Sequence, residues 1–163
     1  MVFTLFVNGK LRELETLRLN GTKITGKGLA SLSPLPALRW LELQRTHVTD
    51  RDLGSIKEFS LLEWLDLAGT QLTDKGVREL PFLKRLRKLS LRATNITDEC
   101  LPILARCGGL ELLDLAETKI TNKGLGQLKN LKGLKWVSIQ KTGVTEAGAK
   151  ELRNALPRTR VVY

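Results

Sequence analysis

The stretch LEWLDLAGTQLTDKGVREL, residues 62–80, occurs in close copies elsewhere in the same chain. Residues 14–32 read LETLRLNGTKITGKGLASL, and residues 110–128 read LELLDLAETKITNKGLGQL. Six such copies follow one another every 24 residues without insertion, and each opens with a leucine: Leu14, Leu38, Leu62, Leu86, Leu110 and Leu134. A fixed period of this length predicts a stack of equal units, because one unit is too small to bury its apolar side chains alone.

Numbering each copy from its first leucine gives 24 columns, whose chemistry predicts one strand and one short helix per copy. Columns four and six are apolar, which is the alternation of a half-buried strand. Column twelve is threonine, usually followed by an acidic or small residue, as in Thr73-Asp74, and apolar residues then recur with helical spacing. We therefore expect columns four and six to point into the core and columns three, five and seven to face outward.

Column nine is threonine in every copy: Thr22, Thr46, Thr70, Thr94, Thr118 and Thr142. We expect each hydroxyl to turn inward and to bond backbone groups where the strand bends into the loop, because buried backbone groups need partners. Identical hydroxyls without a neighbouring base do not predict catalysis.

The pattern L-x-x-L-x-L-x-x-T-x-[IVL]-T-x-x-x-[LVA] over residues 14–157 resembles that of leucine-rich-repeat proteins. The segments TDKGV (73–77) and TNKGL (121–125) are similar to the T-D-x-G-L subclass, found in bacterial repeat arrays and, with cysteine at column nine, in F-box-associated receptors. The resemblance implies an α/β repeat solenoid: a right-handed superhelix with a concave parallel β-sheet and short helices on the convex side. It also implies a protein partner on the concave face.

The six repeats account for residues 14–157, and the two ends are predicted separately. Residues 158–163 place Val161 and Tyr163 at columns four and six, which predicts a terminal strand. Residues 1–13 are interpreted as a degenerate half-repeat or cap. Neither end offers a polar capping repeat, which favours a chain that belongs to a longer protein.

All three tryptophans stand in column three, which reads Thr16, Trp40, Trp64, Lys88, Leu112 and Trp136. Neighbouring strands lie about 4.8 Å apart, so we expect Trp40 and Trp64 side by side, with Lys88 approaching the face of Trp64. Exposed indoles favour a protein-binding surface. The alternative is that they only stack on each other and stiffen the sheet.

Columns five and seven surround this row with polar side chains of both signs, which is typical of a protein-binding surface. The predicted partner-binding residues are Trp40, Trp64, Trp136, Lys88, Leu112, Glu42, Asp66, Arg92 and Asp114.

The chain carries 27 Lys and Arg against 17 Asp and Glu, a net charge of +10, which favours acidic partners. The densest basic run is KRLRK, residues 84–88. It gives an alternative anion-binding site for nucleic acid or an anionic membrane: Lys84, Arg85, Arg87 and Lys88. The other interpretation of these charges is a solvated rim that keeps the protein soluble.

Column two alternates in sign along the chain: Glu15, Arg39, Glu63, Arg87, Glu111 and Lys135. Opposite charges on adjacent strands predict a ladder of ion pairs. Such a ladder specifies the register of the repeats and is not a binding site.

The residue types predict no enzyme, no cofactor and no metal site. His47 is the only histidine and falls in a loop column. Cys100 and Cys107 are seven residues apart, too far for a disulfide if that stretch is helical, and lack a nearby histidine for zinc. No apolar run approaches the ~18 residues of a membrane span. Without a signal-peptide pattern or a disulfide framework, we expect a cytoplasmic location.

Overall fold

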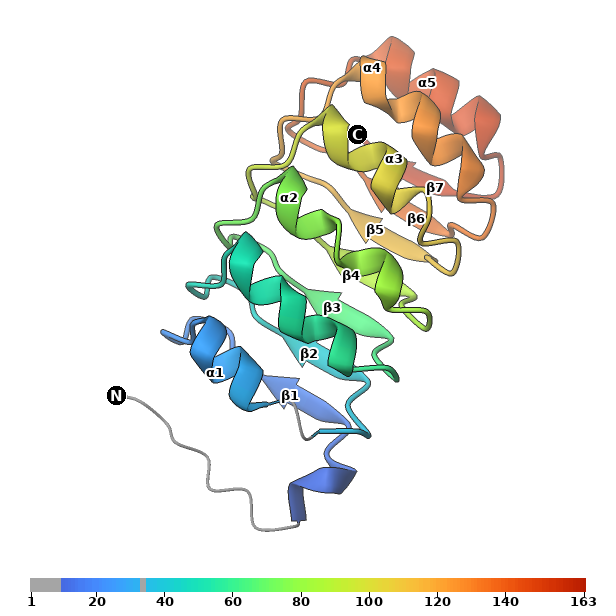
Figure 1. The fold of residues 1–163 in the computed structure, drawn as a ribbon. Helices are drawn as coiled ribbons and strands as arrows, with labels where there is room; N and C mark the ends of the chain where they lie inside the picture. Colours follow the sequence, from blue (N-terminus) through green and yellow to red (C-terminus); the bar gives the residue numbers. More distant parts are fainter. Residues whose placement is uncertain (1–9, 33–34) are drawn as a thin grey trace.

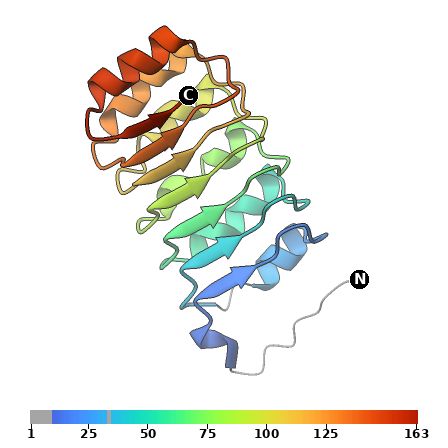
Figure 2. The same cartoon turned by 180° about the vertical axis from the view of Figure 1, so that it is seen from behind.

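The computed structural model describes residues 10–32 and 35–163, which form a stack of parallel strands backed by helices (Figure 1). The strands pair in chain order in one seven-stranded sheet: β1 (Thr16–Arg18), β2 (Trp40–Glu42), β3 (Trp64–Asp66), β4 (Lys88–Ser90), β5 (Leu112–Asp114), β6 (Trp136–Ser138) and β7 (Arg160–Val162). Figure 2 shows the sheet from its open side, with the helices behind it. The predicted solenoid, with a concave parallel sheet and helices on the convex side, is confirmed.

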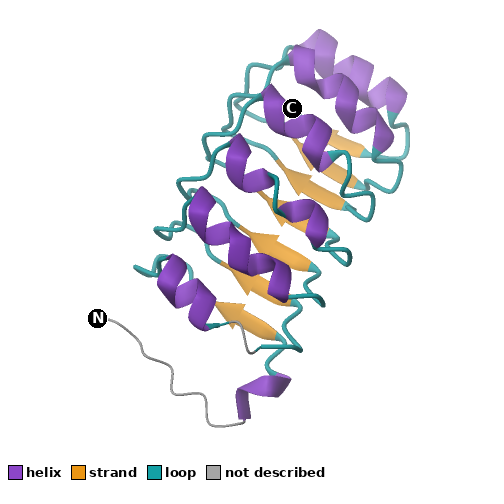
Figure 3. Ribbon diagram, viewed as in Figure 1, coloured by secondary structure: helices purple, strands orange, loops and turns teal. Residues whose placement is uncertain are grey.

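The segments between the strands are short helices of two kinds (Figure 3). The α-helices are α1 (Gly26–Ser31), α2 (Asp74–Val77), α3 (Leu101–Leu104), α4 (Asn122–Leu125) and α5 (Glu146–Ala155). The 3₁₀ helices are η1 (Lys10–Glu13), η2 (Asp50–Glu58), η3 (Leu80–Phe82), η4 (Asp98–Cys100) and η5 (Gly126–Asn130). Repeat two has only the 3₁₀ helix η2, whose middle contains Gly54 and Ser55, both weaker α-helix formers than alanine. Residues 1–9 of the predicted cap lie outside the described residues.

The strands pair in register, so every column of the repeat forms a row across the sheet. Trp40 pairs with Trp64, and Leu41 with Leu65, and each later strand continues these rows one repeat further. Equal repeat length is the cause, because an inserted residue would shift one strand against its neighbour.

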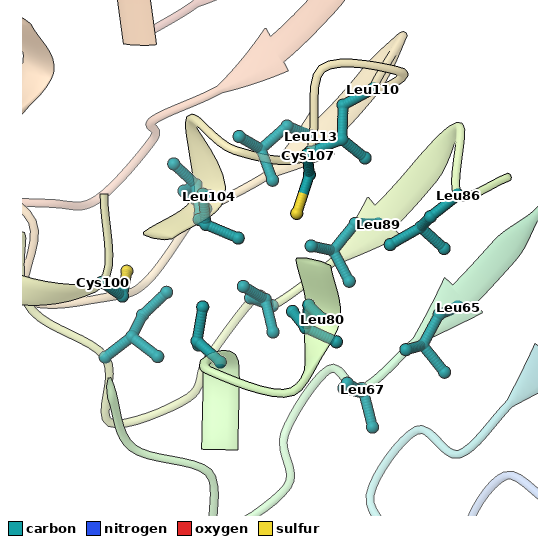
Figure 4. Packing of buried hydrophobic residues seen from close by; sticks show 14 of the residues in the cluster. Leu65, Leu67, Leu80, Leu86, Leu89, Cys100, Leu104, Cys107, Leu110 and Leu113 are labelled. Carbon is teal, nitrogen blue, oxygen red and sulfur yellow. The ribbon is translucent and has the colours of Figure 1, made fainter. Parts of the chain in front are cut away.

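The inward columns fill the core, as predicted. Leu65 and Leu67 are 0 % exposed, and columns four and six are buried in every repeat from the second to the sixth. Figure 4 shows Leu65, Leu89 and Leu113 of successive repeats following one another through the core. Each such leucine contributes about 1.5–3 kcal/mol of burial free energy, which a single repeat could not gain alone.

The column-nine threonines bind the backbone at the strand-to-loop bend, which confirms the prediction. Thr46 Oγ1 donates to the carbonyl oxygen of Leu43 at 2.7 Å, and Thr118 Oγ1 donates to that of Leu115 at 2.6 Å. The other four copies make the same bond three residues back. The threonine column is therefore structural.

Column thirteen links repeats two to six, each to the next, a contact that was not predicted. Asp74 accepts two hydrogen bonds from Thr97 of the following repeat, one from its backbone N and one from its Oγ1, both at 2.8 Å. The same link joins Asp50 to Thr73 and Asp98 to Thr121. Asn122 also joins Thr145, accepting from its backbone N and donating from Nδ2 to its Oγ1. We expected these residues to serve the start of their own helices. They reach the next repeat because the parallel stack brings its turn within hydrogen-bonding distance.

The column-two ladder forms along most of the sheet. Arg39 pairs with Glu63 at 2.6 Å and with Glu15 at 3.8 Å, and Glu111 pairs with both Arg87 and Lys135. Within the described part of the chain, Glu63 and Arg87 do not pair with each other. The ladder is therefore two triplets and not a continuous chain.

Candidate functional site

Two of the three tryptophans meet on the outer side of the sheet. The ring centroids of Trp40 and Trp64 lie 5.5 Å apart with planes tilted by 45°, so the predicted contact is confirmed. Trp136 lies three strands further along the row, beyond Lys88 and Leu112. All five side chains are half-buried, whereas the sequence predicted exposed indoles; large side chains on neighbouring strands cover one another.

Lys88 joins the tryptophan pair, but on a different ring from the one expected. Its Nζ lies 5.3 Å from the ring centroid of Trp40, two strands away, and not over Trp64 as predicted. The long lysine side chain spans the intervening strand, and the cation–π contact is worth about 0.5–1 kcal/mol at a partly exposed site. We call Trp40, Trp64 and Lys88 the tryptophan site.

Glu42 fixes the outer end of the tryptophan site. Its carboxylate accepts hydrogen bonds from the indole N–H of Trp40 at 3.1 Å, from Asn20 at 2.7 Å and from Arg18 at 3.0 Å. Burial alone raises the pKa of Glu42, but these hydrogen bonds and the charge of Arg18 outweigh it, so the pKa of Glu42 is lowered. The orientation of the Trp40 ring is therefore held by a charged acceptor.

Asp66 is buried, although its column faces outward. It is 7 % exposed and accepts hydrogen bonds from Ala68 N at 2.9 Å and Gln44 Nε2 at 3.1 Å. Burial raises the pKa of Asp66; hydrogen bonds from Ala68 and Ser90 lower it, and the charges of Glu42 and Asp114 raise it further. Alternation predicted only that column five faces outward, because it sets the direction of a side chain and not what neighbouring side chains cover.

The indole N–H of Trp64 is buried and has no hydrogen-bond acceptor among the described residues. An unmade hydrogen bond of this kind costs about 1–3 kcal/mol. Trp40, on the next strand, has Glu42 as its acceptor. The pair therefore contains one satisfied and one unsatisfied indole, a difference that no sequence pattern indicated.

The remaining predicted residues lie in other contacts of the sheet. Arg92 is exposed and pairs with Glu117 at 2.7 Å, on the strand-to-helix side of the sheet. The hydrogen bonds from Arg92 and then Lys141 lower the pKa of Glu117. Asp114 accepts from Ala116 N at 3.0 Å, as Asp66 does from Ala68. These carboxylates thus hold the turn that follows their strand.

The predicted anion-binding residues do not form one cluster. Lys84 and Arg85 are exposed in the turn that precedes β4. Arg87 pairs with Glu111 at 2.9 Å, and Lys88 lies over Trp40 on the sheet. The KRLRK run is therefore divided between an edge of the solenoid and its sheet.

The two cysteines are core residues. Both are free and buried, and Figure 4 shows them well apart among leucines. Burial, then the neighbouring Asp74, raises the pKa of the Cys100 thiol, and burial raises the pKa of the Cys107 thiol to about 11. Thiols of this kind are poor nucleophiles. In residues 10–32 and 35–163, no three His, Cys, Asp or Glu side chains are grouped to hold a metal ion.

The described part of the chain contains no helix that is both long and apolar enough to cross a membrane.

Several solved structures share this arrangement of strands and helices. A leucine-rich-repeat protein of Leptospira interrogans is 20 % identical, with a TM-score of 0.73, over 94 % of this chain and 38 % of its own. Two internalins of Listeria monocytogenes are also similar. One, inlF, is 17 % identical, with a TM-score of 0.66, over 93 % of this chain and 48 % of its own. The other, inlC2, is 24 % identical, with a TM-score of 0.68, over 91 % of this chain and 70 % of its own. The chain thus spans less than half the length of the first two.

The sequence model of the leucine-rich-repeat family matches residues 10–33 and 60–80. The chain thus has the fold of leucine-rich-repeat proteins. No curated protein matches it in sequence. The leucine-rich-repeat fold is commonly a protein-interaction module, and its members are typically not enzymes. The T-D-x-G-L subclass stays a prediction.

Proposed function

We propose that this leucine-rich-repeat chain is a non-catalytic recognition module that binds a protein partner on its concave sheet, through the tryptophan site and the row that continues to Leu112 and Trp136. The carrying observation is the Trp40–Trp64 pair with Lys88 over Trp40, on the outer side of a sheet whose inner side is uniformly aliphatic. Tryptophan is the residue type most enriched among binding hot spots.

The polar surround supports contact with a protein and gives no support to catalysis. Glu42 and Asp66 accept hydrogen bonds from neighbouring side chains and backbone, so neither carboxylate is free to act as a base. Arg92 is paired with Glu117. The charges at the centre of the sheet are of both signs, which suits a mixed protein surface better than a row of phosphates. The cytoplasmic location stays a prediction from the sequence.

Photo-crosslinking tests the proposal. We would place p-benzoyl-phenylalanine at position 112, in the middle of the outer row, and irradiate the chain in a membrane-cleared lysate of its source organism. A defined protein adduct is expected, and it should disappear when Trp40→Ser and Trp64→Ser are added. The matched control carries the same photoreactive residue at position 82, where Phe82 is exposed on a different surface. Identical adducts from both positions, or none from position 112, would overturn the proposal.

Salt dependence sharpens the same experiment. A tryptophan-anchored interface should keep its adduct when the salt concentration is raised, because its stabilisation is largely apolar. A contact governed by phosphate neutralisation would instead weaken steeply. Loss of the adduct at moderate salt would therefore count against the tryptophan site as its anchor.

A further inference from the structure

The two edges of the solenoid differ in charge. We call the helix-to-strand turns of repeats two to six the basic edge: residues 57–61, 81–85, 105–109, 129–133 and 153–157. Apart from one acidic residue, Glu58, its charged residues are all basic: Lys57, Lys84, Arg85, Arg106, Lys129, Lys132 and Arg153. The opposite edge consists of the strand-to-helix turns of the same repeats, residues 45–50, 69–74, 93–98, 117–122 and 141–146. It holds three basic and five acidic residues. A large part of the net charge of +10 is therefore gathered on one edge.

Six of the seven cations of the basic edge form no ion pair with any described residue. Every one except Arg153 is exposed, and Arg153 is also the only one of them in an ion pair within the described part of the chain, with Glu146 at 3.3 Å. Cations are favourable near helix C-termini. That effect does not account for Lys84, Arg85 and Lys132, which lie in turns beyond the ends of helices only a few residues long.

An apolar side chain and a groove lie among these cations. Phe82 is 60 % exposed, more than any other large hydrophobic residue that the structure describes. Arg106 occupies the same column in the next repeat. Lys84 and Arg106 line a small groove together with Gly108 and Gly109, and nothing lies within 4 Å of a Cβ placed at Gly108. The groove is thus open to an anionic group between two cations.

We propose that the basic edge docks on an anionic lipid bilayer, with lipid phosphates beside Lys84 and Arg106 and with Phe82 inserted at the level of the headgroups. In-register strands place all five turns at the same end of the strands, so their cations can meet a flat surface together. Phosphates supply the opposite charge. The exposed phenyl ring favours a bilayer over nucleic acid, because aromatic side chains are stabilised at a membrane interface beside basic residues. This surface is separate from the tryptophan site and does not depend on it.

Vesicle co-sedimentation of the full chain tests the proposal. Vesicles of phosphatidylcholine with about one third phosphatidylserine should bind the wild type, and vesicles of phosphatidylcholine alone should not. Each lysine near an anionic surface contributes about a five-fold gain in partitioning, so Lys57→Gln, Lys84→Gln and Lys132→Gln together should weaken binding about a hundred-fold. Phe82→Ser alone should weaken it about ten-fold.

The matched control is the triple variant Lys27→Gln, Lys75→Gln and Lys123→Gln, which removes the same charge from exposed lysines at the other end of the helices. It should keep binding within about three-fold, because these lysines do not face the same surface as the basic edge. Circular dichroism and thermal melting confirm that both triple variants fold. Equal loss of vesicle binding in the two triple variants would mean that net charge alone governs binding, and it would overturn the proposal. Absence of wild-type binding, or preferential binding of a DNA duplex that competes with the vesicles, would also overturn it.

Discussion

On the inner side of the sheet the repeats carry nearly identical residues, whereas on the outer side the residues vary in size, polarity and charge. The inner row at column four reads Leu41, Leu65, Leu89, Leu113 and Val137, and all five are 0 % exposed. The outer row one residue earlier reads Trp40, Trp64, Lys88, Leu112 and Trp136. The same three-residue strand thus serves stability on one face and is left free to vary on the other.

The difference separates two kinds of requirement on one strand. An inner leucine must fit between the leucines of two neighbouring repeats, so its shape is specified by the stack. An outer residue has neighbours only within its row and meets solvent or a partner beyond it. We therefore interpret uniform columns as scaffold and variable columns as the place where binding is specified.

The largest expected effect is on the inner side. Leu65→Ala should lower the free energy of unfolding by about 2–5 kcal/mol, because it leaves a cavity in the middle of the stack. Urea unfolding followed by circular dichroism measures it. The matched control is Leu17→Ala in the first strand, where the leucine is only half-buried and the loss should be smaller. Equal losses at both positions would mean that burial does not determine how much each leucine of the inner column stabilises the fold.

The link between repeats gives the next largest effect. Asp74→Ala should cost about 2 kcal/mol, because the backbone N–H and the hydroxyl of Thr97 lose their acceptor. Asp74→Asn should cost much less, since Asn122 bonds the same two groups of Thr145, accepting from its backbone N and donating to its Oγ1. Chemical unfolding of both variants measures the difference. If alanine and asparagine were equivalent, the link between repeats would contribute nothing beyond helix capping.

Asp66 belongs to an outward-facing column but is buried, so its titration tests the boundary between the two faces of the sheet. Its folded-state pKa is raised, mainly by burial, so the folded state binds its proton more tightly than the unfolded chain does. Its contribution to stability is therefore fully present below the ordinary carboxyl pKa of about 4 and is lost as pH rises through the folded pKa. Relative to Asp66→Asn, the wild type should gain stability as the pH is lowered from about 7 to about 3. Unfolding curves at both pH values measure it, and a gain in the opposite direction would mean that Asp66 is stabilised as a carboxylate.

The charge ladder gives the smallest effect. Glu63→Arg should lower the free energy of unfolding by about 0.5 kcal/mol, because it replaces the 2.6 Å pair with Arg39 by a repulsion. Glu63→Gln should lose less, and both losses should fade in about 1 M salt, where exposed charges are screened. Thermal melting at low and high salt measures this. A loss that persisted in high salt would point to packing and not to charge.

The sequence predicted the rows but not the contacts across them. A period of 24 with apolar columns four and six was enough to place Leu65 and Leu67 inside, and a uniform threonine column was enough to predict its backbone bond. The column-thirteen link was missed, because it joins residues 23 apart. A usable signal existed: glycine at column fifteen, as at Gly76, leaves room for the aspartate of the preceding repeat.

The candidate site was predictable in its position and not in its detail. Every tryptophan stands in column three, so the alternation of the strand alone placed them in one outward-facing row. Lys88 was assigned to Trp64 because that residue is its strand neighbour, yet the side chain reaches Trp40. Rotamers of long side chains depend on the space that their neighbours leave, and a repeat pattern does not contain that information.

The central claim is that the outer tryptophans serve binding while the inner leucines serve folding. The most direct measurement is a pair of assays on one variant, Trp40→Ser, Trp64→Ser and Trp136→Ser: urea unfolding, and capture of the protein identified by crosslinking at position 112. We predict that the variant folds with a loss of at most about 2 kcal/mol, and that its affinity for the partner falls by several kcal/mol, since each hot-spot truncation costs about 2 kcal/mol or more. A sharp loss of stability with unchanged capture by the folded fraction would contradict the claim and make the row a stiffener of the sheet.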